Sequence, residues 1–242
     1  MASANEANEL QRLSLRAFTA LYALRTDWRG SLVLSAGHDV HGAALAVASH
    51  IAGAVSLAID SDTARIREAV RSGAADFVVN TLDEAIRAMK NEIRRQNPLS
   101  VVLAAAPDAA LEEALERGLA PQVFTSFPCA DLDQGLEQKS SVRFREMGAE
   151  LVQFEGGRET AGWNAERLIE QTVEGKRWEM DSFTFDSVAE LRAFDARALA
   201  GLEGDGLRRR WLEAVPRILQ RQRPPQRWLW LTGQERNAYS VR

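Results

Sequence analysis

A turn with the composition of a phosphate-binding loop lies near the start of the 242-residue chain. Residues 37–42 are Gly-His-Asp-Val-His-Gly, and they follow an apolar run and precede a helical pattern rich in alanine. A Gly-x-Gly-x-x-Gly turn in this place binds a pyrophosphate at the amides that open the helix. Gly37 and Gly42 supply the outer glycines, but Asp39 replaces the middle one. Its carboxylate would occupy the space of the phosphate and repel it.

A second acidic residue extends this pattern. Asp60 ends the next apolar run, about 20 residues beyond the turn, where an acidic side chain holds a ribose hydroxyl. The opposing interpretation needs no ligand, because a glycine turn before a small-residue helix also suits close packing of the helix on a sheet. The pair His38 and His41 with Asp39 could suggest a metal, but no further ligand is evident, so we expect no metal site.

Nucleophilic chemistry has one candidate, the single cysteine Cys129. No base lies next to it in the sequence, so we interpret it as an inert small residue and leave the catalytic residues unknown. One cysteine excludes an intrachain disulfide and favours a reducing compartment. The N-terminus lacks a signal-peptide pattern, and no apolar run approaches the ~20 residues of a membrane-spanning helix. We therefore expect a cytoplasmic protein without a membrane partner.

The elements that must position the turn are short apolar runs separated by helical patterns. Most runs are apolar throughout, as in strands buried on both faces of a parallel sheet. Thr81 and Glu84 form a capping box at the start of one intervening helix. The predicted strands are residues 32–36, 54–59, 76–79, 99–104, 122–127 and 150–154.

The alternation predicts an α/β fold, a doubly wound Rossmann-like parallel sheet with an N-terminal helix and a helical C-terminal extension. The N-terminal helix spans residues 10–24. Beyond residue 156 we expect helices at 188–199 and 207–222, the second kinked at Pro216. The predicted division is 1–29 for the N-terminal helix, 30–160 for the Rossmann-like domain and 161–242 for the extension.

Charge excludes a general nucleic-acid binder. The chain has 30 Lys and Arg against 34 Asp and Glu, a formal net charge of −4, whereas such proteins carry a concentrated positive field. The C-terminal stretch is locally basic, with acidic neighbours such as Glu213, and we interpret it as a solvated helix face rather than an anion site. Its arginines are Arg208, Arg209, Arg210, Arg217, Arg221, Arg223 and Arg227.

An apolar stripe accompanies those arginines. Its members recur at the helical period and then in the segment that follows. We expect a second subunit to cover this stripe, which predicts a homodimer. The stripe consists of Trp211, Val215, Ile218, Leu219, Trp228 and Trp230.

The order of several segments resembles the urocanase (urocanate hydratase) family, NAD-dependent lyases of histidine breakdown. Residues 37–46 resemble that family's Gly-Leu-Gly-Gly-Met-Gly-Gly-Ala-Gln-Pro turn. Residues 52–54 (Ala-Gly-Ala) and 56–60 (Ser-Leu-Ala-Ile-Asp) are similar to its Ala-Gly-Ala and Ser-Leu-Asn-Ile-Glu. Residues 115–121 with Thr125 resemble its Arg-Gly-Val-Arg-Pro segment and the threonine beyond it.

Two segments depart from the family. Residues 127–131 (Phe-Pro-Cys-Ala-Asp) replace a Gln-Thr-Ser-Ala-His segment that touches NAD, so only Ala130 is kept. Residues 227–233 resemble the family's Arg-Trp segment, and in that register Gln220 stands in place of the catalytic cysteine. A glutamine cannot replace a thiol. Three residues keep the family's identities there: Arg221, Pro225 and Arg227.

The resemblance implies NAD as the cofactor, with the acidic residue and a nearby arginine near the ribose. Because the turn and the cysteine are altered, we expect a urocanase-related protein without urocanate hydratase activity that binds a nucleotide or another small ligand at the first turn. Two alternatives stay open, an active NAD-dependent urocanase-like lyase and a scaffold that dimerises through its C-terminal tail. The expected ligand contacts are Gly37, His38, Asp39, Val40, His41, Gly42, Asp60, Arg65 and Thr125.

Overall fold

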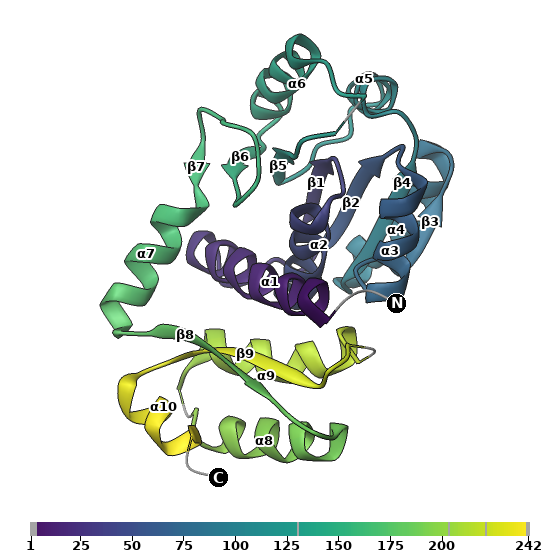
Figure 1. The fold of residues 1–242 in the computed structure, drawn as a ribbon. Coiled ribbons are helices and arrows are strands. Elements are labelled where there is room, and N and C mark those ends of the chain that lie inside the picture. Colours follow the sequence, from purple (N-terminus) through teal and green to yellow (C-terminus); the bar gives the residue numbers. More distant parts are fainter. Residues whose placement is uncertain (1–3, 130, 203, 221, 241–242) are drawn as a thin grey trace.

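The structure is a computed structural model that describes residues 4–129, 131–202, 204–220 and 222–240 (Figure 1). Ala130 and Arg221, which the family resemblance singles out, lie outside the described residues. Within the described part, no helix is both long and apolar enough to cross a membrane.

The centre of the molecule is one parallel sheet, and its middle strand carries the turn. The first strand in the sequence, residues 32–36, pairs with a strand on each side. The registers are Leu32↔Val55 on one side and Val33↔Val123 on the other. This confirms the predicted α/β fold with a Rossmann-like parallel sheet. In order across the sheet, the strands are β3 (Phe77–Val79), β4 (Leu99–Ala104), β2 (Val55–Asp60), β1 (Leu32–Ala36), β5 (Val123–Ser126), β6 (Glu150–Gln153) and β7 (Trp163–Asn164).

Helices cover both faces of the sheet. Successive strand residues alternate between the two sides, as the strand period of two requires. On β1, Val33 joins a core shared with α1 and α2, and Leu34 joins a core shared with α4, α5 and α6. These helices are α1 (Ala4–Leu24), α2 (Val40–Ala52), α3 (Thr63–Ser72), α4 (Leu82–Arg95), α5 (Pro107–Glu116), α6 (Gln134–Glu146) and α7 (Ala165–Lys176).

The local signals at helix ends act as the sequence predicts. Thr81 accepts from the amide of Glu84, and the Glu84 side chain accepts from the amide of Thr81, so the capping box is confirmed. The α2 helix ends at Gly53, whose φ of 90° suits a residue without a Cβ. The α1 helix begins earlier than predicted, at Ala4, and packs along α2 and α7.

The C-terminal part contains two strands that the helical prediction missed. They form an antiparallel pair with the register Glu179↔Leu231, and helices flank this pair (Figure 1). The second strand alternates faces, so its tryptophans lie on one side and its leucines on the other. The elements are β8 (Glu179–Thr184), α8 (Val188–Ala200), α9 (Gly206–Ile218), β9 (Gln226–Leu231) and α10 (Gly233–Ser240). The α9 helix contains Pro216 and ends four residues before the predicted Gln222.

The apolar stripe of α9 is covered by the same chain. Trp211 is fully buried, stacks on Phe18 of α1 with ring centroids 6.2 Å apart, and donates to the carbonyl of Trp228 at 2.8 Å. Trp230 donates to Thr19 of α1 at 2.8 Å. The expectation that this stripe needs a second subunit as its cover is therefore wrong, because α1 and α2 of the same chain pack against α9, and α1 packs against β9. A homodimer stays a prediction without that support.

The basic stretch is also less solvated than predicted. Arg208 is buried, pairs with Asp205 and Glu235 at 2.7 Å each, and lies over the ring of Trp178. Arg227 is buried too and pairs with Asp195. The net negative charge of the whole chain could not distinguish these buried arginines from exposed ones such as Arg209.

Candidate functional site

The two surviving glycines of the turn are required by the fold itself. Gly37 has a φ of 85°, and a Cβ there would lie 2.8 Å from the carbonyl oxygen of Phe127. A Cβ at Gly42 would lie 2.7 Å from the carbonyl oxygen of Gly37. Such distances are below any real contact, so larger residues would displace backbone. The packing interpretation therefore accounts for both glycines without a ligand.

Asp39 is the N-cap of α2. Its Oδ1 accepts from the amides of His41 at 3.0 Å and Gly42 at 3.1 Å. Burial acts to raise the pKa of Asp39, but hydrogen bonds from the His41 side chain and the Gly42 amide outweigh it, and the pKa lies below its ordinary value. The carboxylate is therefore ionised at neutral pH. It holds the amides that a pyrophosphate would use.

Asp60 is likewise engaged by the turn. It is 1% exposed at the end of β2. Its Oδ2 accepts from the amide of His38 at 2.6 Å, and its Oδ1 accepts from the amide of Asp62 at 2.8 Å. Arg65 reaches the same Oδ2 at 3.4 Å and also donates to the carbonyl of Pro128 at 3.3 Å. The structure thus brings the predicted acidic residue and arginine together, but the carboxylate faces protein amides rather than solvent.

The two histidines of the turn have opposite environments. His38 is 1% exposed, and neither ring nitrogen has a partner in the described part of the chain. Burial lowers the pKa of His38 to about 4, so the ring is neutral. The hydrogen bond with Asp39 raises the pKa of His41, although burial opposes it, and the carboxylates of Glu155 and Glu9 add to the rise.

The loop after β6 closes over the start of α2. The ring of His41 lies above Gly156, where a Cβ would approach to 2.5 Å. The same ring stacks on Phe127, with centroids 6.5 Å apart. Val40 is 38% exposed beside it. Gly156 and Phe127 therefore both lie against His41 in the first turn of α2.

The end of β5 supplies the remaining predicted residues. Thr125 is buried, and its Oγ1 has no partner among the described residues. Burial raises the pKa of the Cys129 thiol to about 11, with the nearby Asp60 carboxylate contributing. The thiol is protonated at neutral pH, which agrees with the interpretation of Cys129 as unreactive. Within the described residues, no three His, Cys, Asp or Glu side chains are grouped to hold a metal.

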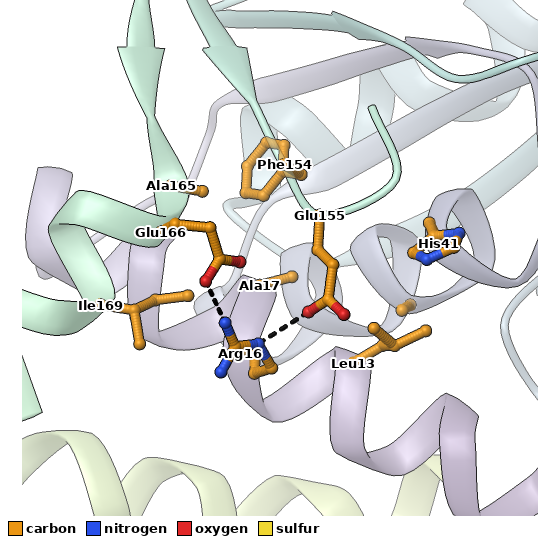
Figure 2. Close-up of a pocket in the computed structure, with 10 residues that line it drawn as sticks. Leu13, Arg16, Ala17, His41, Phe154, Glu155, Ala165, Glu166 and Ile169 are labelled. Atoms are coloured by element: carbon orange, nitrogen blue, oxygen red, sulfur yellow. Dashed lines mark hydrogen bonds and ion pairs between the residues drawn. The ribbon is translucent and has the colours of Figure 1, made fainter. Parts of the chain in front are cut away.

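A groove runs beside the turn and was not predicted from the sequence. A narrow apolar slot lies between α1, α2, the loop after β6 and the start of α7 (Figure 2), and it opens into a groove of about 380 Å³. Arg16 crosses it, pairing with Glu155 at 2.7 Å and with Glu166 (Figure 2). Arg12 also holds Glu155, at 2.8 Å. These pairs join segments about 140 residues apart, so no local sequence signal could have revealed them.

The turn as folded does not fit a dinucleotide pyrophosphate. The amides of His41 and Gly42 already donate to Asp39. The Asp60 carboxylate, which would hold a ribose hydroxyl in an NAD site, already accepts from two backbone amides. A phosphate brought to this helix end would meet an ionised carboxylate within contact distance, where like charges repel strongly. Gln220, which the sequence resemblance aligns with the family's cysteine, lines a separate cavity whose lining includes no residue of the turn.

A comparison with known families bears on the origin of this arrangement. Residues 14–132 match the urocanase Rossmann-like domain. The match includes the turn, Asp60, Arg65 and Thr125, and it confirms the resemblance over this part of the chain. In urocanases this domain is an NAD-binding fold. We conclude that residues 14–132 form a domain similar to the Rossmann-like domain of urocanases.

Proposed function

We propose that this urocanase-related protein does not hydrate urocanate and does not hold NAD at its first turn. The observation that carries the proposal is the Asp39 carboxylate on the amides of His41 and Gly42. The helix end that would attract a phosphate is neutralised by the chain itself. A family domain can keep its fold while its chemistry changes.

The environment of the possible nucleophiles supports the absence of hydration. Gln220 occupies the position that the resemblance assigns to a catalytic cysteine. Cys129 offers no substitute, because its pKa of about 11 leaves almost no thiolate at neutral pH. The single cysteine is also in keeping with a reducing compartment such as the cytoplasm.

The test is an assay of the full chain with urocanate and added NAD, followed through loss of the substrate's ultraviolet absorbance. We expect no turnover above a heat-killed control. Calorimetric titration with NAD is run in parallel, and we expect no saturable heat. Turnover would support the active-lyase alternative, and NAD binding without turnover would show that the turn opens in solution.

A thermal-shift screen extends this test to other ligands. A ligand at a hundred times its dissociation constant stabilises the folded state by about 2.7 kcal/mol, a readily measured shift. We expect NAD, NADP, ATP and ADP to give no shift. A shift with any of them that disappears in an Asp60→Ala variant would place a nucleotide at the turn and contradict the proposal.

A further inference from the structure

A second cavity lies in the C-terminal part of the chain, apart from the turn. It is bounded by α8, the end of α9, the segment after α9 and the start of β9, and it has a volume of about 180 Å³. Ligand pockets typically measure ~300–1,000 Å³, so an occupant of this cavity must be small. The family match ends at residue 132, well before these elements.

The cavity floor holds a buried ion pair with spare donor capacity. Arg227 is 2% exposed and Asp195 is 5% exposed. The guanidinium donates from Nε and Nη2 to the two carboxylate oxygens, at 2.8 Å each. Nη1 has no acceptor among the described residues, so this donor is left for an occupant of the cavity that Arg227 lines. Asp195 meanwhile fixes the orientation of the guanidinium plane.

Two further arginines give the cavity a positive rim. Arg192 of α8 is exposed and makes no ion pair within the described part of the chain. Arg223 uses Nη1 to hold the carbonyls of Gln220 at 3.2 Å and Gln222 at 2.7 Å, which fixes its side chain against the cavity. Three guanidinium groups therefore face one carboxylate among the lining residues. The field in the cavity favours an anion, although the whole chain carries a net charge of −4.

The remaining wall of the cavity is apolar, which restricts the kinds of anion that would fit. Val188, Leu191, Leu219 and two prolines contribute to the lining. An inorganic phosphate or sulfate would leave this surface without a partner. A planar carboxylate matches the fork of a guanidinium, and an apolar body attached to it would cover the aliphatic wall.

We propose that this cavity binds a small organic carboxylate, with Arg227 and Arg192 holding the carboxylate and the α8–α9 wall holding its apolar body. The proposal does not depend on the turn, because no residue of the turn lines the cavity. The NAD titration, which tests the turn, is therefore independent of this proposal.

The test is a titration of the full, isotope-labelled chain with benzoate, butyrate and inorganic phosphate, followed through backbone amide chemical shifts. We expect benzoate to give saturable shifts at Leu191, Arg192 and Arg227, and phosphate to bind at least fivefold more weakly. No saturable shift with either carboxylate, shifts confined to other regions, or equal binding of phosphate would overturn the proposal.

Matched variants assign the effect to the cavity. Arg192→Gln and Arg223→Gln each remove one rim charge from an exposed side chain, so both should fold. We expect each to weaken benzoate binding about fivefold. Arg167→Gln removes the same charge from an exposed position of α7 that does not line the cavity, and it should bind as the parent does. Equal affinity in all three variants would contradict the assignment.

Discussion

The Asp39 carboxylate accepts from the amide of Gly42 at 3.1 Å, at the helix end where a Rossmann-like turn receives phosphate. A side chain of the turn thus makes the interactions that a bound anion would otherwise make. The same carboxylate also approaches His41 Nδ1 at 3.3 Å. The turn is therefore organised as a helix cap rather than as an open phosphate cradle.

Asp39→Gly is expected to open the turn. The substitution frees the amides of His41 and Gly42 and removes the charge repulsion, so NAD or ADP should bind more tightly, by a few kcal/mol at most. Calorimetric titration measures the gain. Asp39→Asn separates the two effects, because it removes the charge while its amide oxygen can still cap α2, and it should show only part of the gain. Equal binding by all three proteins would mean that the loop at Gly156, rather than Asp39, closes the turn.

The sequence contains part of this arrangement and conceals the rest. Strand and helix alternation predicts the sheet because both faces of β1 and β2 are buried, which leaves continuous apolar runs. An aspartate one residue before Val40 is also a standard N-cap signal. The hydrogen bond between Asp60 and the amide of His38 spans 22 positions. Nothing local indicates that this carboxylate turns inward rather than toward a ribose.

The C-terminal part was harder to predict for a related reason. The β9 strand alternates two tryptophans with leucines, and residues on both of its faces are buried. A short apolar aromatic run of this kind suits a strand or a helix equally by periodicity. Trp211 is covered by α1, which lies almost 200 positions earlier in the chain. The sequence around Trp211 therefore gives no sign of what covers the stripe.

His38 should make stability depend on pH. Its pKa is about 4 in the folded chain and about 6.5 when exposed, so between these values the unfolded chain binds a proton that the folded chain does not. The free energy of unfolding therefore has its full value above pH ~6.5 and falls by about 3 kcal/mol as the pH drops to ~4. Urea unfolding of the parent and of His38→Phe across this range isolates the effect. A difference between the two that is independent of pH would contradict it.

Cys129 should be slow to alkylate in the native protein. A thiol pKa of about 11 lowers the thiolate fraction at pH 8 by roughly two orders of magnitude relative to an ordinary cysteine. Iodoacetamide labelling followed by mass spectrometry compares the rates in buffer and in urea. We expect native labelling to be about a hundredfold slower. Rates within tenfold of each other would contradict the raised pKa, and native labelling faster than in urea would indicate an activated thiol.

Asp195→Ala should destabilise the C-terminal part strongly. It leaves the buried guanidinium of Arg227 unpaired, which costs about 3–5 kcal/mol. Replacing both partners, with Asp195→Leu and Arg227→Met, should recover much of that loss, because no buried charge remains. Denaturant unfolding measures both variants. Glu213→Ala, which breaks the half-exposed pair with Arg209, is the control and should cost less than ~1 kcal/mol. An equal cost for the buried and exposed pairs would contradict the burial of Arg227.

Trp211 distinguishes packing within the chain from contact between chains. Its ring is fully buried against Phe18, so Trp211→Glu should place a charge in the core of one molecule and unfold it. Trp211→Phe keeps an aromatic ring there but leaves the carbonyl of Trp228 without its donor, which costs about 1–3 kcal/mol and should leave a folded protein. Light scattering then compares this variant with the parent at the same concentration. Because the ring is covered by α1, we expect the two to have the same mass, whatever that mass is. A parent dimer that becomes a folded monomer on Trp211→Phe would show that the stripe leaves α1 to form the subunit contact.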